Sequence, residues 1–279
     1  MASAVKSNDD WGSHFRLVAA DKWKAKSAAM GQAVTDALVE YARPRTGMQV
    51  LDLASGTGEP AISLAMRVGE QGHVTALDRS ADLLEIARGR AEARGLRNFS
   101  IRQADAQSLP FPDEAFDMAT SRFGVMFFKD GVAAMRELRR VLKPGARACF
   151  VVWGSFKQPY FQSMIGVVLR HAGGPLLPPG GDDPFRFAEA GSLSAVLRAA
   201  GFQAVEEQLV TLPWDWPGSV EEVWEYSQQV AAPFRAALDR VPADMRPRID
   251  AAVHEAVGKY FDGQKVAFGA KVVLASGTK

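Results

Sequence analysis

From residue 48 onward, short runs of apolar and β-branched residues alternate with longer segments of helical periodicity. This alternation is typical of βαβ units, in which helices join parallel strands. The short runs predict strands over Gln49–Leu53, His73–Leu77, Phe99–Gln103, Phe116–Ser121, Arg147–Trp153, Phe202–Leu212 and Lys265–Leu274. The segments between them predict helices over Pro60–Val68, Ala81–Arg94, Gly131–Leu142, Tyr160–Arg170 and Ala188–Ala200. We therefore expect an α/β fold with a doubly wound, mostly parallel sheet.

Two further segments have helical character and lie outside this alternation. Residues 1–45 are polar with scattered large apolar residues, and they predict an N-terminal helical flap. Residues 214–263 show helical spacing with many aromatic residues, and they predict a helical cap. Because a predicted strand follows this cap, we expect residues 46–279 to form one domain with the cap inserted before its last strand.

The composition is that of a folded globular protein. Of the 279 residues, 47% are hydrophobic and 23% are charged, and the net charge is +1, which provides no global field for nucleic acid or an anionic membrane. The apolar runs fall far short of the ~20 residues that span a bilayer, and the N-terminus lacks a signal-peptide core. The lone cysteine, Cys149, fits a reducing compartment. We predict a cytoplasmic protein with a small-molecule substrate and no nucleic-acid or membrane partner. The sequence leaves open whether it forms a homo-oligomer.

The most informative stretch is VLDLASGTGEP at residues 50–60, where an apolar strand runs into a turn that contains two glycines. Gly56 and Gly58 allow positive φ and close approach of a ligand to the backbone. Ligands of open α/β sheets bind at the carboxyl ends of the strands. Asp78 ends the next predicted strand, where a carboxylate can accept hydrogen bonds from ribose hydroxyls. These features predict a cofactor that contains adenosine.

Nicotinamide dinucleotides and S-adenosylmethionine both fit this outline. The dinucleotide fingerprint G-x-G-x-x-G is not met, because its other glycine positions hold Ala54 and Glu59 when it is aligned on Gly56. Glu59 and Asp52 would repel a pyrophosphate at the helix N-terminus. S-adenosylmethionine has no phosphate and carries an ammonium and a sulfonium, so the acidic loop favours it. The alternative to a cofactor site is a turn that needs its glycines for its backbone conformation and binds no ligand.

Two other segments follow predicted strands at the same edge of the sheet. Asp105 comes just after the third strand, where its carboxylate can accept the adenine amine while the backbone of Ala106 meets the ring. The segment Phe116–Phe128 contains the fourth strand and the turn that follows it. Both segments are therefore expected beside the glycine-containing turn.

With these segments the chain resembles class I S-adenosylmethionine-dependent methyltransferases, of the small-molecule type related to ubiquinone and menaquinone biosynthesis. The resemblance rests on Val50–Glu59, Asp78, Ala104–Phe111, Phe116–Phe128 and Arg140–Gly145. It implies a seven-stranded sheet with an antiparallel last strand. It further implies that the cofactor is bound by Asp52, Ala54, Ser55, Gly56 and Gly58 around the methionine moiety, Asp78 and Arg79 at the ribose, Asp105, Ala106 and Gln107 at the adenine, and Arg122 and Phe123 near the methyl donor. Ala54 departs from the family pattern, which often has glycine there.

Methyl transfer from a sulfonium is an in-line displacement, so alignment and proximity can supply much of the catalysis. Some acceptors also require a base. His14 is the candidate catalytic base, because the N-terminal flap covers the cofactor in the family that the chain resembles; packing or solvent exposure is the alternative role. The fourth strand ends in Ser121-Arg122-Phe123, which offers no carboxylate cage for a hard cation. We therefore predict no metal requirement.

The acceptor pocket is expected between the flap, the segment after Trp153 and the cap, which are rich in aromatic residues. Those residues are Trp153, Phe156, Tyr160, Phe161, Phe185, Phe187, Trp214, Trp216 and Trp224. Apolar walls suit a small, largely apolar or aromatic metabolite, methylated on oxygen, carbon or nitrogen. Core packing is the alternative role of these aromatics. A protein that binds S-adenosylmethionine without methylating, or a nicotinamide-dependent dehydrogenase, also remains open.

Overall fold

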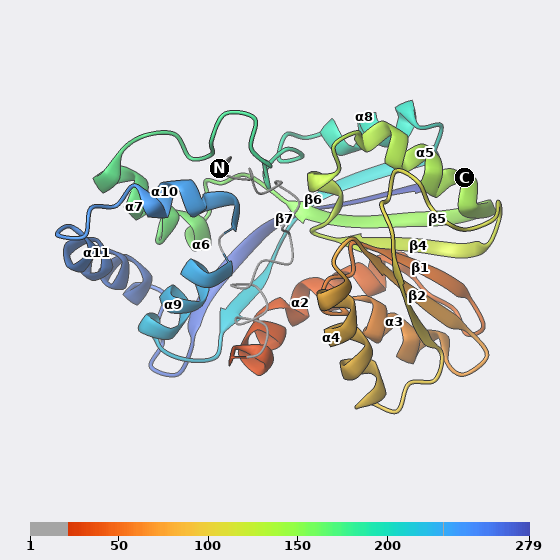
Figure 1. Ribbon diagram of the computed structural model, residues 1–279, viewed down its shortest axis with the longest axis horizontal. Helices are drawn as coiled ribbons and strands as arrows, with labels where there is room; N and C mark the ends of the chain where they lie inside the picture. Colours follow the sequence, from red (N-terminus) through yellow and green to blue (C-terminus); the bar gives the residue numbers. More distant parts are fainter. Residues whose placement is uncertain (1–21, 231) are drawn as a thin grey trace, which may run out of the picture.

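The computed structural model describes residues 22–230 and 232–279, which are arranged around one twisted sheet (Figure 1). Within these residues, seven strands pair in the order β3-β2-β1-β4-β5-β7-β6. The strands are β1 (Gln49–Leu53), β2 (His73–Asp78), β3 (Phe99–Gln103), β4 (Phe116–Arg122), β5 (Leu142–Trp153), β6 (Gln203–Trp216) and β7 (Val266–Thr278). The pairs among β1 to β5 are parallel, whereas β7 runs antiparallel to both β5 and β6. The predicted doubly wound sheet with an antiparallel last strand is confirmed.

Helices flank this sheet as the alternating pattern predicts. They are α2 (Lys24–Ala42), α3 (Ala61–Val68), α4 (Ala81–Glu92), α5 (Gly131–Val141) and α8 (Ser192–Ala199). Two of them begin at side-chain caps: Ser80 Oγ accepts the Leu83 N–H of α4, and Asp130 accepts the Ala133 N–H of α5. Such caps satisfy amide groups that have no partner within the helix. The helices α3, α4 and α5 each follow a strand of the parallel sheet along the chain, whereas α2 precedes β1.

The inner strands are buried, and their sequences are nearly continuous apolar runs. Val50, Leu51 and Leu53 of β1 have no accessible surface, and the same holds for the run 148–152 of β5. Parallel strands covered by helices on both faces have this pattern. The described part of the predicted flap contributes α2, which packs against β5 and β6 and buries Val34 and Leu38.

A group of helices, which we call the cap, lies beside the sheet at one end of the molecule (left in Figure 1). It comprises α6 (Pro159–Gln162), α7 (Ile165–Ala172), α9 (Val220–Val230), α10 (Arg235–Asp239) and α11 (Arg246–Gly258). The helix α7 packs against α10 and α11, and α9 packs against α11. The cap is therefore assembled from two segments of the chain, one after β5 and one between β6 and β7.

The predicted start of the inserted cap at residue 214 is wrong, because β6 continues to Trp216. Trp214 pairs with Phe268 and Trp216 pairs with Val266 across the β6–β7 ladder. This pairing satisfies backbone groups that a helix would otherwise have to satisfy. The inserted helices accordingly run from Val220 to Gly258.

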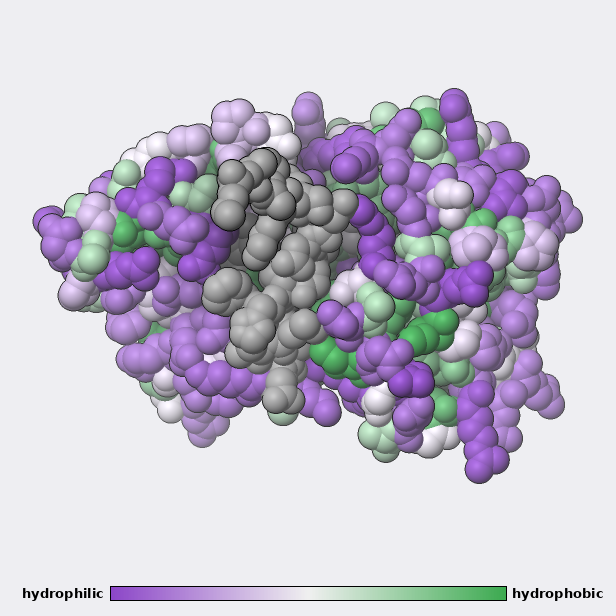
Figure 2. Space-filling model, viewed as in Figure 1, coloured by the Kyte–Doolittle hydropathy of each residue, from purple (hydrophilic) through white to green (hydrophobic). Residues whose placement is uncertain are grey.

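The surface on the face shown in Figure 2 is mostly hydrophilic over the described residues, with small hydrophobic areas near its centre. Among the described residues, large exposed hydrophobic side chains are few: Met66, Leu209 and Phe261. In this part of the chain, no helix is long and apolar enough to cross a membrane.

Candidate functional site

A cavity of about 470 Å³ lies at the carboxyl ends of the parallel strands and extends under the cap. Its volume is in the range of small-molecule and cofactor sites. The walls come from α2, from the loops after β1 and β3, from the ends of β2, β4 and β5, and from the cap. The predicted cofactor edge and the predicted acceptor pocket are thus two halves of one cavity.

The loop of residues 54–59, which we call the glycine loop, is tied to the end of β2. The Ser55 N–H donates to Leu77 O over 3.0 Å, and Ser55 Oγ accepts the Leu77 N–H over 3.1 Å. The Gly56 N–H donates to Asp78 Oδ2 over 2.8 Å. Gly56 has a φ of +52°, and a Cβ at this position would meet no atom within 4 Å. The glycine loop therefore presents open backbone to the cavity.

Ala54 and Gly58 serve the conformation and packing of the same loop. Ala54 lines the cavity and has a φ of +53°. This left-handed conformation favours glycine, which the family often has here, so alanine adopts it at some cost in backbone strain. Gly58 has a φ of +111°, and a Cβ there would lie 2.7 Å from Ile62 Cδ1 and 3.2 Å from Ala87 Cβ. Gly58 is not in the described lining of the cavity. It lets α3 and α4 approach each other, and its predicted contact with the methionine moiety stays a prediction.

Replacing Gly58 with alanine is expected to lower the free energy of unfolding by about 2 kcal/mol, because the new methyl group overpacks against Ala87. Urea denaturation measures the effect. The matched control is Gly89→Ala within α4, where a Cβ meets nothing within 4 Å. That change should be neutral or stabilising by about 0.5–1 kcal/mol. Equal stability of G58A and the wild type would contradict the packing role.

Asp78 lies at the end of β2, half-buried in the cavity wall. Its Oδ2 accepts the Gly56 N–H, and its Oδ1 accepts the Ser80 N–H over 2.9 Å. Each carboxylate oxygen can accept more than one hydrogen bond, so the group can also receive ribose hydroxyls. Arg79 lines the cavity beside it and is exposed. Asp78 thus both supports the glycine loop and faces the ligand space.

The loop of residues 104–115, which we call the adenine-side loop, brings Asp105, Ala106 and Gln107 to the cavity wall. Asp105 Oδ1 accepts the Gln107 N–H over 2.8 Å. Gln107 Oε1 accepts the Asp130 N–H over 2.9 Å, which joins this loop to the start of α5. The structure therefore brings these three predicted residues together with Asp78 along one side of the cavity.

Asp52 is fully buried in β1 and is absent from the described lining of the cavity, and its contact with the methionine moiety stays a prediction. Thr120 Oγ1 donates to Asp52 Oδ1 over 2.7 Å, while Oδ2 has no hydrogen-bond partner among the described residues. Burial raises the pKa of Asp52 to about 7, and the Thr120 hydrogen bond opposes the shift. Its carboxyl group is thus hydrogen-bonded to the neighbouring strand β4.

Arg122 and Phe123 end β4 and face the middle of the cavity. Arg122 Nη1 donates to Thr35 Oγ1 over 3.1 Å and to Gly31 O over 3.4 Å, and a Cβ on Gly31 would lie only 2.8 Å from this nitrogen. Burial lowers the pKa of Arg122, and the carboxylates of Glu59 and Asp52 counteract that shift. Arg122 Nε has no hydrogen-bond partner in the described chain. Gly31 thus makes room for the Arg122 guanidinium where the two halves of the cavity meet.

The half of the cavity under the cap is lined by aromatic side chains. Phe123 stacks on Trp153 with ring centroids 4.2 Å apart, and Trp214 meets Trp153 edge-on at 5.0 Å. Tyr160 lies parallel to Trp153, and its hydroxyl is 3.4 Å from Ser227 Oγ. Burial raises the pKa of Tyr160, so its hydroxyl stays protonated at neutral pH. This half is an apolar space with a small number of hydroxyl groups.

Several aromatics predicted for the acceptor pocket pack in or against the hydrophobic core instead, Phe156 and Phe185 being only partly buried. The described lining omits Phe156, Phe185, Phe187, Trp216 and Trp224. Trp216 is fully buried and stacks on Tyr226, and the Trp224 Nε1–H donates to Asp250 Oδ1 over 2.8 Å. These side chains hold the cap together, as the packing alternative states.

The cavity also includes residues that the sequence pattern did not indicate. Arg90 reaches it from α4 and donates to both Thr57 O and Thr57 Oγ1, over 3.1 and 2.7 Å. Glu59 lines the cavity while its Oε2 accepts hydrogen bonds from the Ser63 amide and hydroxyl groups. Thr35 comes from α2. The acidity of the glycine loop was a signal for Glu59, whereas helix packing alone brings in Arg90 and Thr35.

The candidate base His14 lies outside the described residues, so its role stays a prediction. His73 bonds Ser100 at the amino-terminal end of the sheet, and His171 bonds Val167 O within α7. Among the described residues, no group of three or more His, Cys, Asp or Glu is placed to hold a metal ion. Metal independence likewise remains a prediction.

The parallel sheet with an antiparallel last strand, the glycine loop and the carboxylates after β2 and β3 define a class, the S-adenosylmethionine-dependent methyltransferases. Residues 24–168, about half of the chain, match the model of the ubiE/COQ5 methyltransferase family. The chain belongs to this family. Membership confirms the predicted enzyme class and its cofactor, S-adenosylmethionine, and gives no support to the dinucleotide alternative.

Curated relatives match over the same region. Ubiquinone/menaquinone biosynthesis C-methyltransferase UbiE of Xanthomonas oryzae is 41% identical over 125 residues, which are 44% of this chain and 49% of that protein. UbiE of Shewanella sp. (strain ANA-3) is 39% identical over 127 residues, 45% of this chain and 49% of the relative. The matches therefore span about half the length of these relatives.

Solved structures share the fold over most of the chain. The YcgJ protein of Bacillus subtilis has a TM-score of 0.56 and 23% identity, and the match covers 88% of this chain and 97% of that one. The [4+2]-cyclase SpnF has a TM-score of 0.53 and 26% identity, covering 88% and 79% of the two chains.

Proposed function

We propose that this chain transfers a methyl group from S-adenosylmethionine to a carbon or oxygen atom of a small, largely apolar acceptor. The proposal rests on one continuous cavity, in which a wall of carboxylates and open backbone leads into a half lined by aromatic side chains. Its UbiE relatives are named as C-methyltransferases, which supports carbon. Neither the charge of the chain nor the cavity suggests a nucleic-acid or membrane partner.

The residues present fit the cofactor. Gly56 offers open backbone, Asp78 and Asp105 offer carboxylates for the ribose and adenine, and Glu59 offers a carboxylate for a cationic group. The bound cofactor supplies a methyl group already activated by its sulfonium. The chain itself needs to align the two reactants, and proximity can lower the activation free energy by roughly 7–11 kcal/mol.

The aromatic half supports an apolar acceptor. Phe123, Trp153 and Trp214 form walls that exclude water. The hydroxyls of Tyr160 and Ser227 provide hydrogen-bonding groups to orient a polar atom of the acceptor. A few polar groups among apolar walls are typical of specific small-molecule sites.

The test is to incubate the protein with S-adenosylmethionine and a panel of phenols, quinols and polyketide-like acids. We expect S-adenosylhomocysteine release that depends on the acceptor, a product heavier by one methyl group, and a rate within about twofold in the presence of EDTA. Loss of turnover with EDTA would contradict metal independence. Reactions without acceptor are the control.

A second candidate is a protein that binds S-adenosylmethionine without transferring its methyl group. The similarity to the [4+2]-cyclase SpnF favours it, since that protein is named for a cyclisation. Binding of S-adenosylhomocysteine, combined with conversion of an acceptor to a product of unchanged mass, would contradict methyl transfer and support this candidate.

A further inference from the structure

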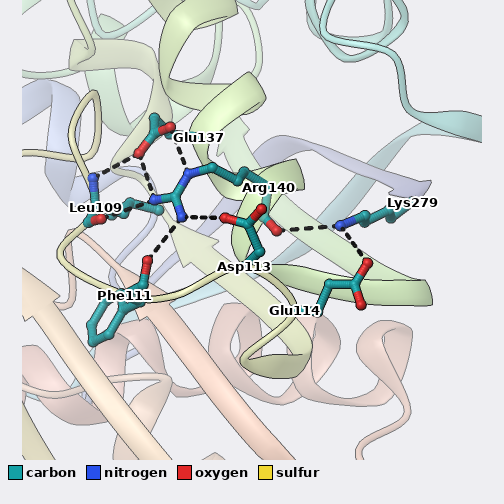
Figure 3. A network of polar contacts seen from close by, with 7 residues as sticks. All are labelled: Leu109, Phe111, Asp113, Glu114, Glu137, Arg140 and Lys279. Atoms are coloured by element: carbon teal, nitrogen blue, oxygen red, sulfur yellow. Dashed lines mark hydrogen bonds and ion pairs between the residues drawn. The ribbon is translucent and has the colours of Figure 1, made fainter.

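A polar network is centred on Arg140 of α5 (Figure 3), and Arg140 is not among the described residues that line the cavity. Arg140 Nη2 donates to Leu109 O over 3.0 Å, and Nη1 donates to Phe111 O over 2.8 Å and to Asp113 Oδ1 over 2.8 Å. Glu137 lies one turn before Arg140 and accepts from its Nε and Nη2, each over 2.9 Å. One guanidinium therefore binds three residues of the adenine-side loop and one residue of its own helix.

Glu137 completes the attachment. Its Oε2 accepts the Leu109 N–H over 3.0 Å, so the Glu137–Arg140 pair satisfies both backbone groups of this buried loop residue. The Arg140 carbonyl in turn accepts the Glu114 N–H over 3.1 Å and Lys279 Nζ over 3.2 Å. The loop is thus attached to α5 at residues 109, 111, 113 and 114.

This attachment matters because the adenine-side loop contains no helix or strand. All of its residues, from 104 to 115, belong to the described part of the chain. Its first residues, Asp105 to Gln107, line the cavity, whereas Arg140 and Glu137 are not in the described lining. A loop without regular structure takes its position from contacts with neighbouring elements. Here those contacts include the hydrogen bonds of Ala104 and Gln107 next to the cavity, and those of Arg140 and Glu137 outside its described lining.

Arg140 is suited to this task in a way that lysine is not. A planar guanidinium donates several hydrogen bonds in fixed directions, whereas an ammonium is a point charge on a flexible stem. The hydrogen bonds from Arg140 lower the pKa of Glu137, and Glu137 and Asp113 raise the pKa of Arg140. Both groups stay charged around neutral pH, which strengthens their hydrogen bonds.

We propose that Arg140, together with Glu137, is a positioning residue that holds the adenine-side loop in the position needed to bind the adenosine part of the cofactor. The inference rests on the proposed function, since it assumes that Asp105 to Gln107 face the adenine. It assigns a role to the Arg140–Gly145 motif, which does not itself reach the cavity.

The test is calorimetric titration of Arg140→Lys with S-adenosylhomocysteine and with 5′-methylthioadenosine, which lacks the amino-acid end. Both ligands should bind about tenfold more weakly, by the same factor, because the perturbed loop faces their common adenosine. Once an acceptor that the protein methylates has been identified, the KM of R140K for S-adenosylmethionine should rise while its kcat stays within about twofold of the wild type. Arg139→Lys is the matched control: Arg139 Nε donates to Gly201 O over 3.0 Å from the same helix, away from the loop.

Glu137→Gln is the second variant, in case R140K folds poorly. It keeps an acceptor for the Leu109 N–H but removes the charge, so it should weaken both ligands by about threefold. Wild-type affinity for both ligands in R140K or E137Q, or an equal loss in R139K, would overturn the inference. A wild-type protein that binds neither ligand would instead overturn the proposed function.

Discussion

Replacing Asp78 with alanine is expected to weaken the binding of S-adenosylhomocysteine by about 100-fold or more. The Asp78 carboxylate accepts the Gly56 and Ser80 amides over 2.8 and 2.9 Å and faces the cavity. Hydrogen bonds to a charged group contribute about 1.5–3 kcal/mol each, and every 1.4 kcal/mol is a factor of ten in affinity. The variant loses the support of the glycine loop and a ligand acceptor together.

Calorimetric titration measures this effect, and two variants control it. Asp78→Asn keeps one acceptor oxygen and should lose about tenfold. Asp82→Ala alters an exposed carboxylate in the first turn of α4 and should bind as the wild type does. If D78A bound the ligand within threefold of the wild type, Asp78 would not be part of the cofactor site.

Asp52→Asn is expected to remove a large part of the pH dependence of stability between pH 4 and pH 7. Burial raises the pKa of Asp52 to about 7 in the folded protein, from a model-peptide value of 3.8. Well below pH 3.8 both the folded and the unfolded chain hold the proton. As the pH rises toward 7, the unfolded chain releases it first, so the free energy of unfolding falls by about 4 kcal/mol in total. Above pH 7 both states are ionised and the loss stops.

Urea denaturation at pH 5 and pH 8 tests this expectation. The wild type should lose about 3 kcal/mol across this interval through Asp52, and D52N should not. Asp244→Asn removes an exposed carboxylate and should keep the wild-type profile. Parallel profiles for D52N and the wild type would show that Asp52 does not titrate with a raised pKa in the folded protein.

The sequence predicted the strands and the cofactor edge well because both leave local patterns. Buried parallel strands are apolar runs, and their carboxyl ends meet at one edge, which is why Asp78 and Asp105 were placed in the same cavity. The direction of a side chain within a buried strand leaves no such pattern. The sequence therefore indicated Asp52 as a residue of the cofactor site but did not indicate that its carboxyl group is fully buried and accepts a hydrogen bond from Thr120.

Residues brought in by packing between distant elements could not be predicted. Trp214 and Trp216 have the two-residue spacing of a strand, but the partner strand lies some fifty residues further along the chain. Arg90 and Thr35 reach the cavity from helices whose orientation depends on the whole sheet. Their roles follow from tertiary structure rather than from a motif.

The direct pairing of Trp216 with Val266 means that the chain leaves the sheet and returns to it at facing positions. The spacing between these two points is set by the β6–β7 ladder and does not depend on what connects them. Residues 217–265 thus form one insertion between two neighbouring positions of the sheet, and Trp23 and Lys26 join this insertion to α2 through Gln229 and Glu222. Changes in the length or sequence of this insertion are therefore expected to alter first the part of the cavity wall that Tyr226, Ser227 and Phe234 provide.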